Sequence, residues 1–123
     1  MAGKIVHFEL PSADADRASA FWGGLFGWNI GGSAMEGFDY RMFQVADGLA
    51  GAVMPSDKAG SGLIVYMDTD DIDASIAKVR ELGGTADEKQ PVPTHGWFSA
   101  CTDTEGNAFS LFQGDESVPG DLS

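Results

Sequence analysis

Cysteine is almost absent from this 123-residue chain, since Cys101 is the only one. A single cysteine cannot form a disulfide within the chain, and nothing in the cysteine content indicates an oxidising compartment. Long apolar runs are missing too. The first residues, MAGKIVHFELPS, lack the apolar segment of a signal peptide, and no run approaches the ~20 residues of a transmembrane helix. We therefore expect a cytoplasmic protein that does not enter a membrane.

Basic side chains are also scarce. Seven Lys and Arg residues face 19 Asp and Glu residues, which gives a net charge of −12 at pH 7. Such a chain repels the phosphate backbone of nucleic acids and anionic membrane surfaces, so we expect neither as a partner. A cationic small molecule fits this charge better. Hydrophobic residues make up 43% and charged residues 21%, which is typical of a globular protein, and the length predicts a single domain over residues 1–123.

Strand and helix patterns alternate over residues 4–55. The run KIVHFEL predicts a strand, and Ser12 or Asp14 can cap a following helix that ends at Phe26, before Gly27. Three more strands are predicted in the short apolar runs WNI (28–30), FDYRMFQV (38–45) and LAGAVM (49–54). This half of the chain therefore has the order βαβββ.

The same order restarts after a Gly- and Ser-containing linker at 56–62. The run LIVYM predicts a strand, and Asp70 or Asp71 can cap a helix that ends near Leu82. Further strands are expected near 85–88, 97–102 and 108–113. The second half thus spans 63–113, and 114–123 is predicted to be a mobile tail. Two βαβββ repeats give an α+β fold class.

Three stretches carry a combined pattern: IVHFELPSADADRASAFWGGLFGW, VYMDTDDIDASIAKVRELGG and DTEGNAFSLFQ. Together they resemble the vicinal oxygen chelate superfamily, which includes glyoxalase I, bleomycin-resistance and fosfomycin-resistance proteins and extradiol dioxygenases. The resemblance implies a cup-shaped mixed sheet with its helices outside, a small-molecule site on the floor of the cup, and a homodimer. It does not select one activity among these relatives.

The resemblance also identifies four positions at which enzymes of this superfamily bind a divalent metal through His, Glu or Gln. They correspond here to His7, Ala52, Ile64 and Ser110. Only His7 offers a good donor atom, so we predict no metal and no other cofactor. One unorthodox arrangement stays open, in which Glu9 joins His7 on the same face of the strand and Gln113 or Asp68 is recruited.

Alternation along the strands predicts which side chains face the cup. The apolar residues Val6, Phe8 and Leu10 form one face of the first strand, and His7 and Glu9 lie on the other. The mixture of aromatic, apolar and few polar groups is typical of a ligand pocket. The predicted ligand-binding residues are His7, Glu9, Ala52, Met54, Ile64, Tyr66, Trp97, Ser110 and Phe112, with Tyr40 and Arg41 as further candidates.

Three functions remain open, and the sequence favours the first. One is metal-free binding of a small molecule, either sequestration like that of bleomycin-resistance proteins or binding of a metabolite. The alternative is a glyoxalase-like lyase, isomerase or dioxygenase with His7 and Glu9 as its catalytic residues, because a carboxyl group beside an imidazole in an apolar site can act as a general base. The third is a non-catalytic module that acts through its dimer surface.

Overall fold

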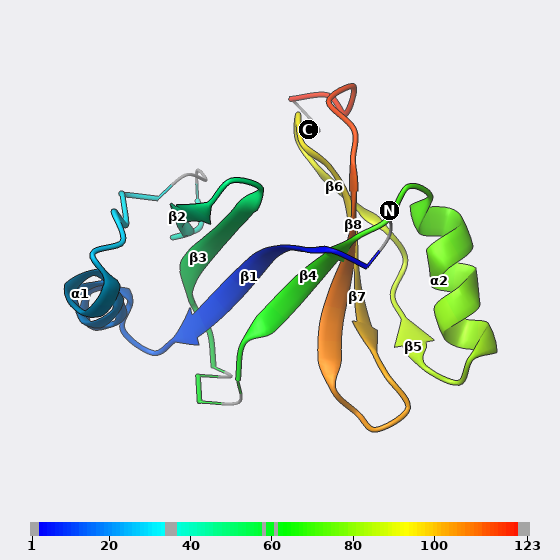
Figure 1. Ribbon diagram of the computed structural model, residues 1–123, viewed down its shortest axis with the longest axis horizontal. Helices are drawn as coiled ribbons and strands as arrows, with labels where there is room; N and C mark the ends of the chain where they lie inside the picture. The colour runs from blue at the N-terminus through cyan, green and yellow to red at the C-terminus, as the bar shows by residue number, and fades with distance from the viewer. Residues whose placement is uncertain (1–2, 34–36, 58, 61, 121–123) are drawn as a thin grey trace. The chain divides into compact units, whose positions relative to one another are not determined.

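The computed structural model describes residues 3–33, 37–57, 59–60 and 62–120 (Figure 1). Contacts divide the chain into two compact units: one comprises residues 6–64, and the other combines the residues up to Ile5 with those from Val65 onward. The division falls just after the predicted linker. The described N-terminal residues join the second unit through two backbone hydrogen bonds. Gly3 donates its N–H to the carbonyl of Asp68, and Asp68 donates its N–H to the carbonyl of Lys4.

The 6–64 unit contains one helix and a three-stranded sheet in the order β2-β3-β1. Strands β1 and β3 are parallel, whereas β2 and β3 are antiparallel. The elements are β1 (Ile5–Ser12), α1 (Ala15–Phe26), β2 (Arg41–Ala46) and β3 (Leu49–Pro55).

Helix α1 begins and ends where the sequence predicts. The side chain of Asp14 accepts the backbone N–H of Arg17, and Gly27 ends the helix with a left-handed φ of 71°. The helix packs on the sheet through Ala15, Ala18 and Trp22. They meet a core formed by Leu10, Phe43 and Val53.

The strand predicted at 28–30 does not form. Ile30 instead donates its N–H to the carbonyl of Trp28, 3.1 Å away, which closes a tight turn. The indole of Trp28 stacks on Phe43 with ring centroids 4.7 Å apart, and Ile30 packs on the same core. The apolar side chains in this run therefore reflect burial beneath the sheet rather than strand pairing.

The second unit contains one helix and five strands. The order is β4-β8-β7-β5, with β6 paired to β7. Sequence analysis missed β6, and the strand expected over 85–88 is only two residues long. The elements are β4 (Ile64–Asp68), α2 (Ile72–Glu81), β5 (Thr85–Ala86), β6 (Gln90–Val92), β7 (Gly96–Thr102) and β8 (Ala108–Gly114).

Helix α2 has two polar groups at its first turn. The carboxylate of Asp71 accepts the N–H of Ala74, and the side-chain oxygen of Gln113 accepts the N–H of Ile72 at 2.8 Å. Ile72 and Ile76 then pack with Cys101 and Leu111 into the core of this unit. Burial raises the pKa of the Cys101 thiol, which disfavours the reactive thiolate.

The internal repeat is visible in the strand order. In each unit the first strand lies parallel to the last, and the last strand pairs antiparallel with the strand before it in the chain. Together the described residues form two helices and eight strands. The predicted α+β fold class is confirmed.

The described part of the tail is attached to the loop before β7. Thr94 donates its N–H to the carbonyl of Val118, and Asp115 donates its own to the carbonyl of His95. The side chain of Val118 is only 3% exposed. These contacts limit the mobility that we expect for residues 114–120.

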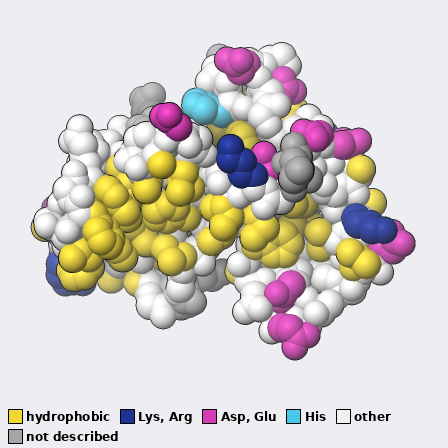
Figure 2. Space-filling model, viewed as in Figure 1, with side chains coloured by type: hydrophobic (Ala, Val, Ile, Leu, Met, Phe, Trp, Pro, Cys, Tyr) yellow, Lys and Arg dark blue, Asp and Glu magenta, His cyan; other side chains and the backbone are white. Residues whose placement is uncertain are grey.

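Helix α1 leaves an apolar surface uncovered. Phe21, Leu25 and Phe26 are 61%, 56% and 58% exposed, and Figure 2 shows apolar side chains gathered over the unit that carries this helix. Surfaces of this kind are often protein contacts, and the homodimer stays a prediction. No helix among the described residues combines the length and the apolarity that crossing a membrane requires.

Candidate functional site

The candidate site lies on the face of the 6–64 sheet that is turned away from α1. We call it the open face because α1 does not cover it. Because Phe8 and Leu10 pack toward α1, alternation places His7 and Glu9 on the open face. The parallel register sets Glu9 beside Ala52 and Pro11 beside Met54. The structure therefore brings four of the predicted ligand-binding residues together: His7, Glu9, Ala52 and Met54.

Tyr40 joins the two polar groups of this face. Its hydroxyl donates to Oε2 of Glu9 at 2.7 Å, and the same oxygen lies 2.6 Å from Nε2 of His7. The His7 and Tyr40 rings are stacked, with centroids 6.1 Å apart and an interplanar angle of 24°. Phe38 extends the stack, because its ring lies 6.2 Å from that of Tyr40 at an angle of 29°. The result is a row of three rings whose middle member, Tyr40, is hydrogen-bonded to a carboxyl group.

Two residues of the open face are buried. Glu9 is 8% exposed and Ala52 is completely buried. Burial lowers the pKa of His7, so its imidazole is neutral at neutral pH. A neutral imidazole can donate from one ring nitrogen and accept at the other, which makes His7 a site for hydrogen bonding rather than a fixed charge.

Two sets of contacts position Tyr40. On one side, the hydroxyl of Ser33 accepts the backbone N–H of Tyr40 at 3.0 Å. On the other, Arg41 forms ion pairs at 2.9 Å with Asp39 and with Asp16 of α1. The hydrogen bonds from Arg41 lower the pKa of Asp39 and keep the carboxylate charged. Arg41 pairs in register with the core residue Val53, so it lies on the α1 side and not on the open face.

In the second unit, three predicted residues share the face turned away from α2. Tyr66 lies opposite Ser110, and Phe112 lies opposite Phe98. The rings of Tyr66 and Phe98 have centroids 6.3 Å apart. Ile64, the remaining predicted residue of β4, is the last residue of the 6–64 unit.

The structure does not bring Trp97 to this face. Trp97 alternates with Phe98 and packs on the α2 side, against the cluster that contains Cys101 and Leu111. Its Nε1 donates to Asp115, and the ammonium of Lys89 lies 4.8 Å from the ring centroid. Phe98 occupies the position that we assigned to Trp97. If buried Cys101 is taken to mark the α2 side of the strand, alternation places Trp97 on that side and Phe98 on the opposite face.

The residues present do not fit the metal site of the superfamily. At the four ligand positions only His7 is a good donor, and Tyr40 already lies within hydrogen-bond distance of its Nε2. The two side chains considered for an unorthodox site, those of Gln113 and Asp68, have other roles. Gln113 caps α2, and Asp68 accepts the backbone N–H of Lys4 at 2.9 Å. No cluster of three His, Cys, Asp or Glu side chains suited to a metal ion occurs in the described part of the chain.

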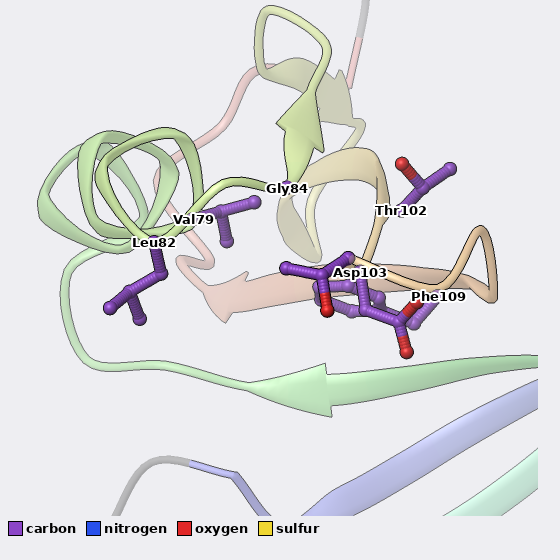
Figure 3. Close-up of a pocket in the computed structure, with 7 residues that line it drawn as sticks. Val79, Leu82, Gly84, Thr102, Asp103 and Phe109 are labelled. Atoms are coloured by element: carbon purple, nitrogen blue, oxygen red, sulfur yellow. The ribbon is translucent and has the colours of Figure 1, made fainter.

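Two hollows on the α2 side of the second unit are poorer candidates. One, of about 190 Å³, lies between the end of α2, which supplies Val79 and Leu82, and the strand and loop that supply Phe109 and Asp103 (Figure 3). It is smaller than most ligand pockets. The other, of about 410 Å³, shares Asp103 and Phe109. Asp103 holds the β7–β8 turn, because it accepts hydrogen bonds from Asn107 and Glu105 that lower its pKa.

Replacing His7 with Gln is expected to reduce the loss of stability in mild acid. Because the folded-state pKa of His7 lies below 6.5, the unfolded chain binds a proton that the folded chain does not. The free energy of unfolding therefore falls as the pH drops below about 6.5, the pKa of His7 in the unfolded chain. The fall from this residue ends once the pH is below its lower pKa in the folded chain. Urea unfolding of both proteins at about pH 7.5 and 5.5 tests this. An equal loss in the two proteins would contradict it.

Comparison with known proteins agrees with this architecture. Residues 6–112 match the glyoxalase-like domain family. A glyoxylase-like domain-containing protein of Didymella fabae is 30% identical over 120 residues, which cover 89% of this chain and 92% of that protein.

Solved structures extend the agreement to the fold. Methylmalonyl-CoA epimerase from Mycobacterium tuberculosis superimposes with a TM-score of 0.70 at 14% identity, covering 91% of this chain and 88% of that one. A glyoxalase/bleomycin resistance protein/dioxygenase superfamily member from Vibrio splendidus 12B01 gives 0.65 at 19% identity, covering 92% and 99%. The chain therefore belongs to the glyoxalase-like domain family, within the vicinal oxygen chelate superfamily.

Proposed function

We propose that this protein binds a small cationic molecule on the open face of its 6–64 sheet, without a metal ion. The observation that carries the proposal is the hydrogen-bonded row of His7, Tyr40 and Glu9, in a chain whose other three superfamily ligand positions, Ala52, Ile64 and Ser110, offer no good donor. A superfamily site without a set of metal ligands can still recognise a ligand through ordered hydrogen-bonding side chains. It cannot polarise the bonds of that ligand through a metal ion.

Charge and shape support a flat cation. The chain carries a net charge of −12, and the carboxyl group of Glu9 lies at the floor of the face. The rings of Phe38, Tyr40 and His7 provide a stacking surface beside it. A ligand with an aromatic body and a protonated nitrogen can use both features, since a cation is favoured near aromatic faces and near a carboxylate.

Catalysis is the second candidate. A chain of hydrogen bonds from Glu9 through Tyr40 to His7 can move a proton between a carboxyl group and an imidazole without a metal. Methylmalonyl-CoA epimerases with the same fold support this candidate, since they are enzymes. The missing metal donors favour binding. If turnover of a substrate were found and were unchanged in Glu9→Gln, Glu9 would have no role as a base.

Three matched probes test the proposed function by calorimetry: 2-naphthylmethylammonium, 2-naphthamide and 2-naphthoate. They share an aromatic body and differ in charge. We expect the cation to bind most tightly and the anion least, with the same affinities when a chelator is present. Equal binding of all three, or no binding of the cation, would overturn the proposal.

A further inference from the structure

We propose that Tyr40 is a positioning residue that fixes the tautomer of His7, so that Nε2 carries the proton and Nδ1 is the acceptor nitrogen. The inference deepens the proposed function and rests on it in one respect, namely that His7 belongs to the binding face. Neither His7 nor Tyr40 needs a bound ligand for this relation to hold, because the contact exists within the 6–64 unit.

The number of protons on Tyr40 and His7 determines the direction of both hydrogen bonds. A tyrosine hydroxyl has one proton to donate, and Tyr40 donates it to Oε2 of Glu9 at 2.7 Å. The hydroxyl oxygen can then only accept from Nε2 of His7, which lies 2.6 Å away. Two lone pairs at that distance would repel each other, so Nε2 must carry the proton. At about pH 8 an imidazole is neutral and carries a single proton, so Nδ1 is left without one.

Tyr40 is held in the geometry that this role requires. Its backbone N–H is bound by Ser33, and its neighbour Arg41 is paired with Asp39 and with Asp16 of α1. The ring is also stacked between those of His7 and Phe38. These contacts fix the hydroxyl between His7 and Glu9 before any ligand arrives, which is the kind of support that a preorganised site needs.

The tautomer also fixes the roles of the two ring nitrogens. With Nδ1 unprotonated, the imidazole of His7 has its acceptor at that nitrogen and its donor at Nε2. The same tautomer places the proton on the nitrogen that faces Tyr40, so that nitrogen cannot bind a metal ion unless the proton is removed.

Nitrogen NMR of the ligand-free protein tests the inference. The chain contains only His7 and His95, so a His95→Gln variant assigns the spectrum. At about pH 8 we expect the wild-type His7 to show a protonated Nε2 and an unprotonated Nδ1. Tyr40→Phe keeps the ring but lacks the hydroxyl. In this variant we expect the ratio of the Nε2-protonated to the Nδ1-protonated form of His7 to fall about fivefold or more, since a hydrogen bond contributes on the order of 1 kcal/mol.

Phe38→Leu is the matched control, because it alters the neighbouring ring of the stack without removing a hydroxyl; we expect the wild-type tautomer there. A protonated Nδ1 in the wild type would overturn the inference, and so would an unchanged ratio in Tyr40→Phe. If that variant does not fold, the wild-type spectrum still tests the proton count, because a protonated Nδ1 would contradict it. Because no probe is present, failure of this test leaves the proposed binding function standing, and failure of the probe titration leaves the tautomer assignment standing.

Discussion

The Glu9→Gln variant is expected to bind 2-naphthylmethylammonium about 10- to 100-fold more weakly than the wild type, with little change for 2-naphthamide. A hydrogen bond to a charged group contributes about 1.5–3 kcal/mol, and tenfold in affinity is about 1.4 kcal/mol. Glutamine keeps an oxygen that can accept from the Tyr40 hydroxyl, so the substitution removes the charge and preserves the bond. Calorimetric titration of both probes measures the effect.

Asp70→Asn is the matched control for that titration. It makes the same change in net charge, but Asp70 is an exposed residue in the turn before α2, in the other unit. If the cation loses the same affinity in both variants, its binding reflects the overall charge of the protein and not the open face. Loss of 2-naphthamide binding in Glu9→Gln would instead show that the face itself had been disrupted.

The Gly96→Ala variant is expected to lose about 3 kcal/mol of stability, and its Tm is expected to fall by roughly 10 °C. A Cβ at Gly96 would lie 2.0 Å from the carbonyl oxygen of Gln113 and 3.0 Å from the ring of Phe112. Both neighbours belong to β8, which pairs with β7 over seven residue pairs. Backbone cannot give way as a flexible side chain does, so the β7–β8 ladder must distort. Thermal and urea unfolding measure the loss.

Gly114→Ala is the control for this variant. Gly114 is the direct cross-strand partner of Gly96, yet a Cβ there would meet nothing within 4 Å. We expect its stability to stay within about 0.5 kcal/mol of the wild type, as for most surface substitutions. Similar losses in the two variants would show that the glycines act through chain flexibility and not through the close approach of β7 to β8.

Much of the fold could be predicted because its signals are local. Asp14, Asp71 and Gly27 lie where helix caps are expected, and the structure uses each of them. Alternation in β1 separates Phe8 and Leu10 from His7 and Glu9 correctly, because the two faces differ in polarity. Local chemistry decides both features, so a single sequence is sufficient to find them.

The errors arise where burial and strand pairing give the same pattern. The run at 28–30 is apolar because Trp28 and Ile30 pack into the core, and no pairing partner can be read from the sequence. Strand β6 contains Pro91 and is three residues long, so its pattern is too short and too unfavourable to indicate a strand. Trp97 was assigned to the wrong face because its strand, GWFSACT, has apolar and polar residues on both faces, so alternation does not distinguish them.

The candidate site was only partly predictable for a related reason. His7 and Glu9 lie two residues apart on one strand, and their common face follows from the strand geometry. Tyr40 is 31 residues from Glu9 and lies before β2, in a segment of irregular structure. Sequence reasoning could name it as a candidate, but the position of its hydroxyl between His7 and Glu9 depends on tertiary contacts, including those of Ser33 and Arg41.

The most direct test of the account is the metal content of the protein purified without a chelator, followed by calorimetric titration with Ni²⁺, Zn²⁺, Mn²⁺ and Fe²⁺. Because Ala52, Ile64 and Ser110 replace the ligands of the superfamily and Tyr40 engages His7, we expect no stoichiometric metal and no saturable binding of any of the four ions. One equivalent of metal that is lost in His7→Ala would contradict the account and show that this open face is a metal site.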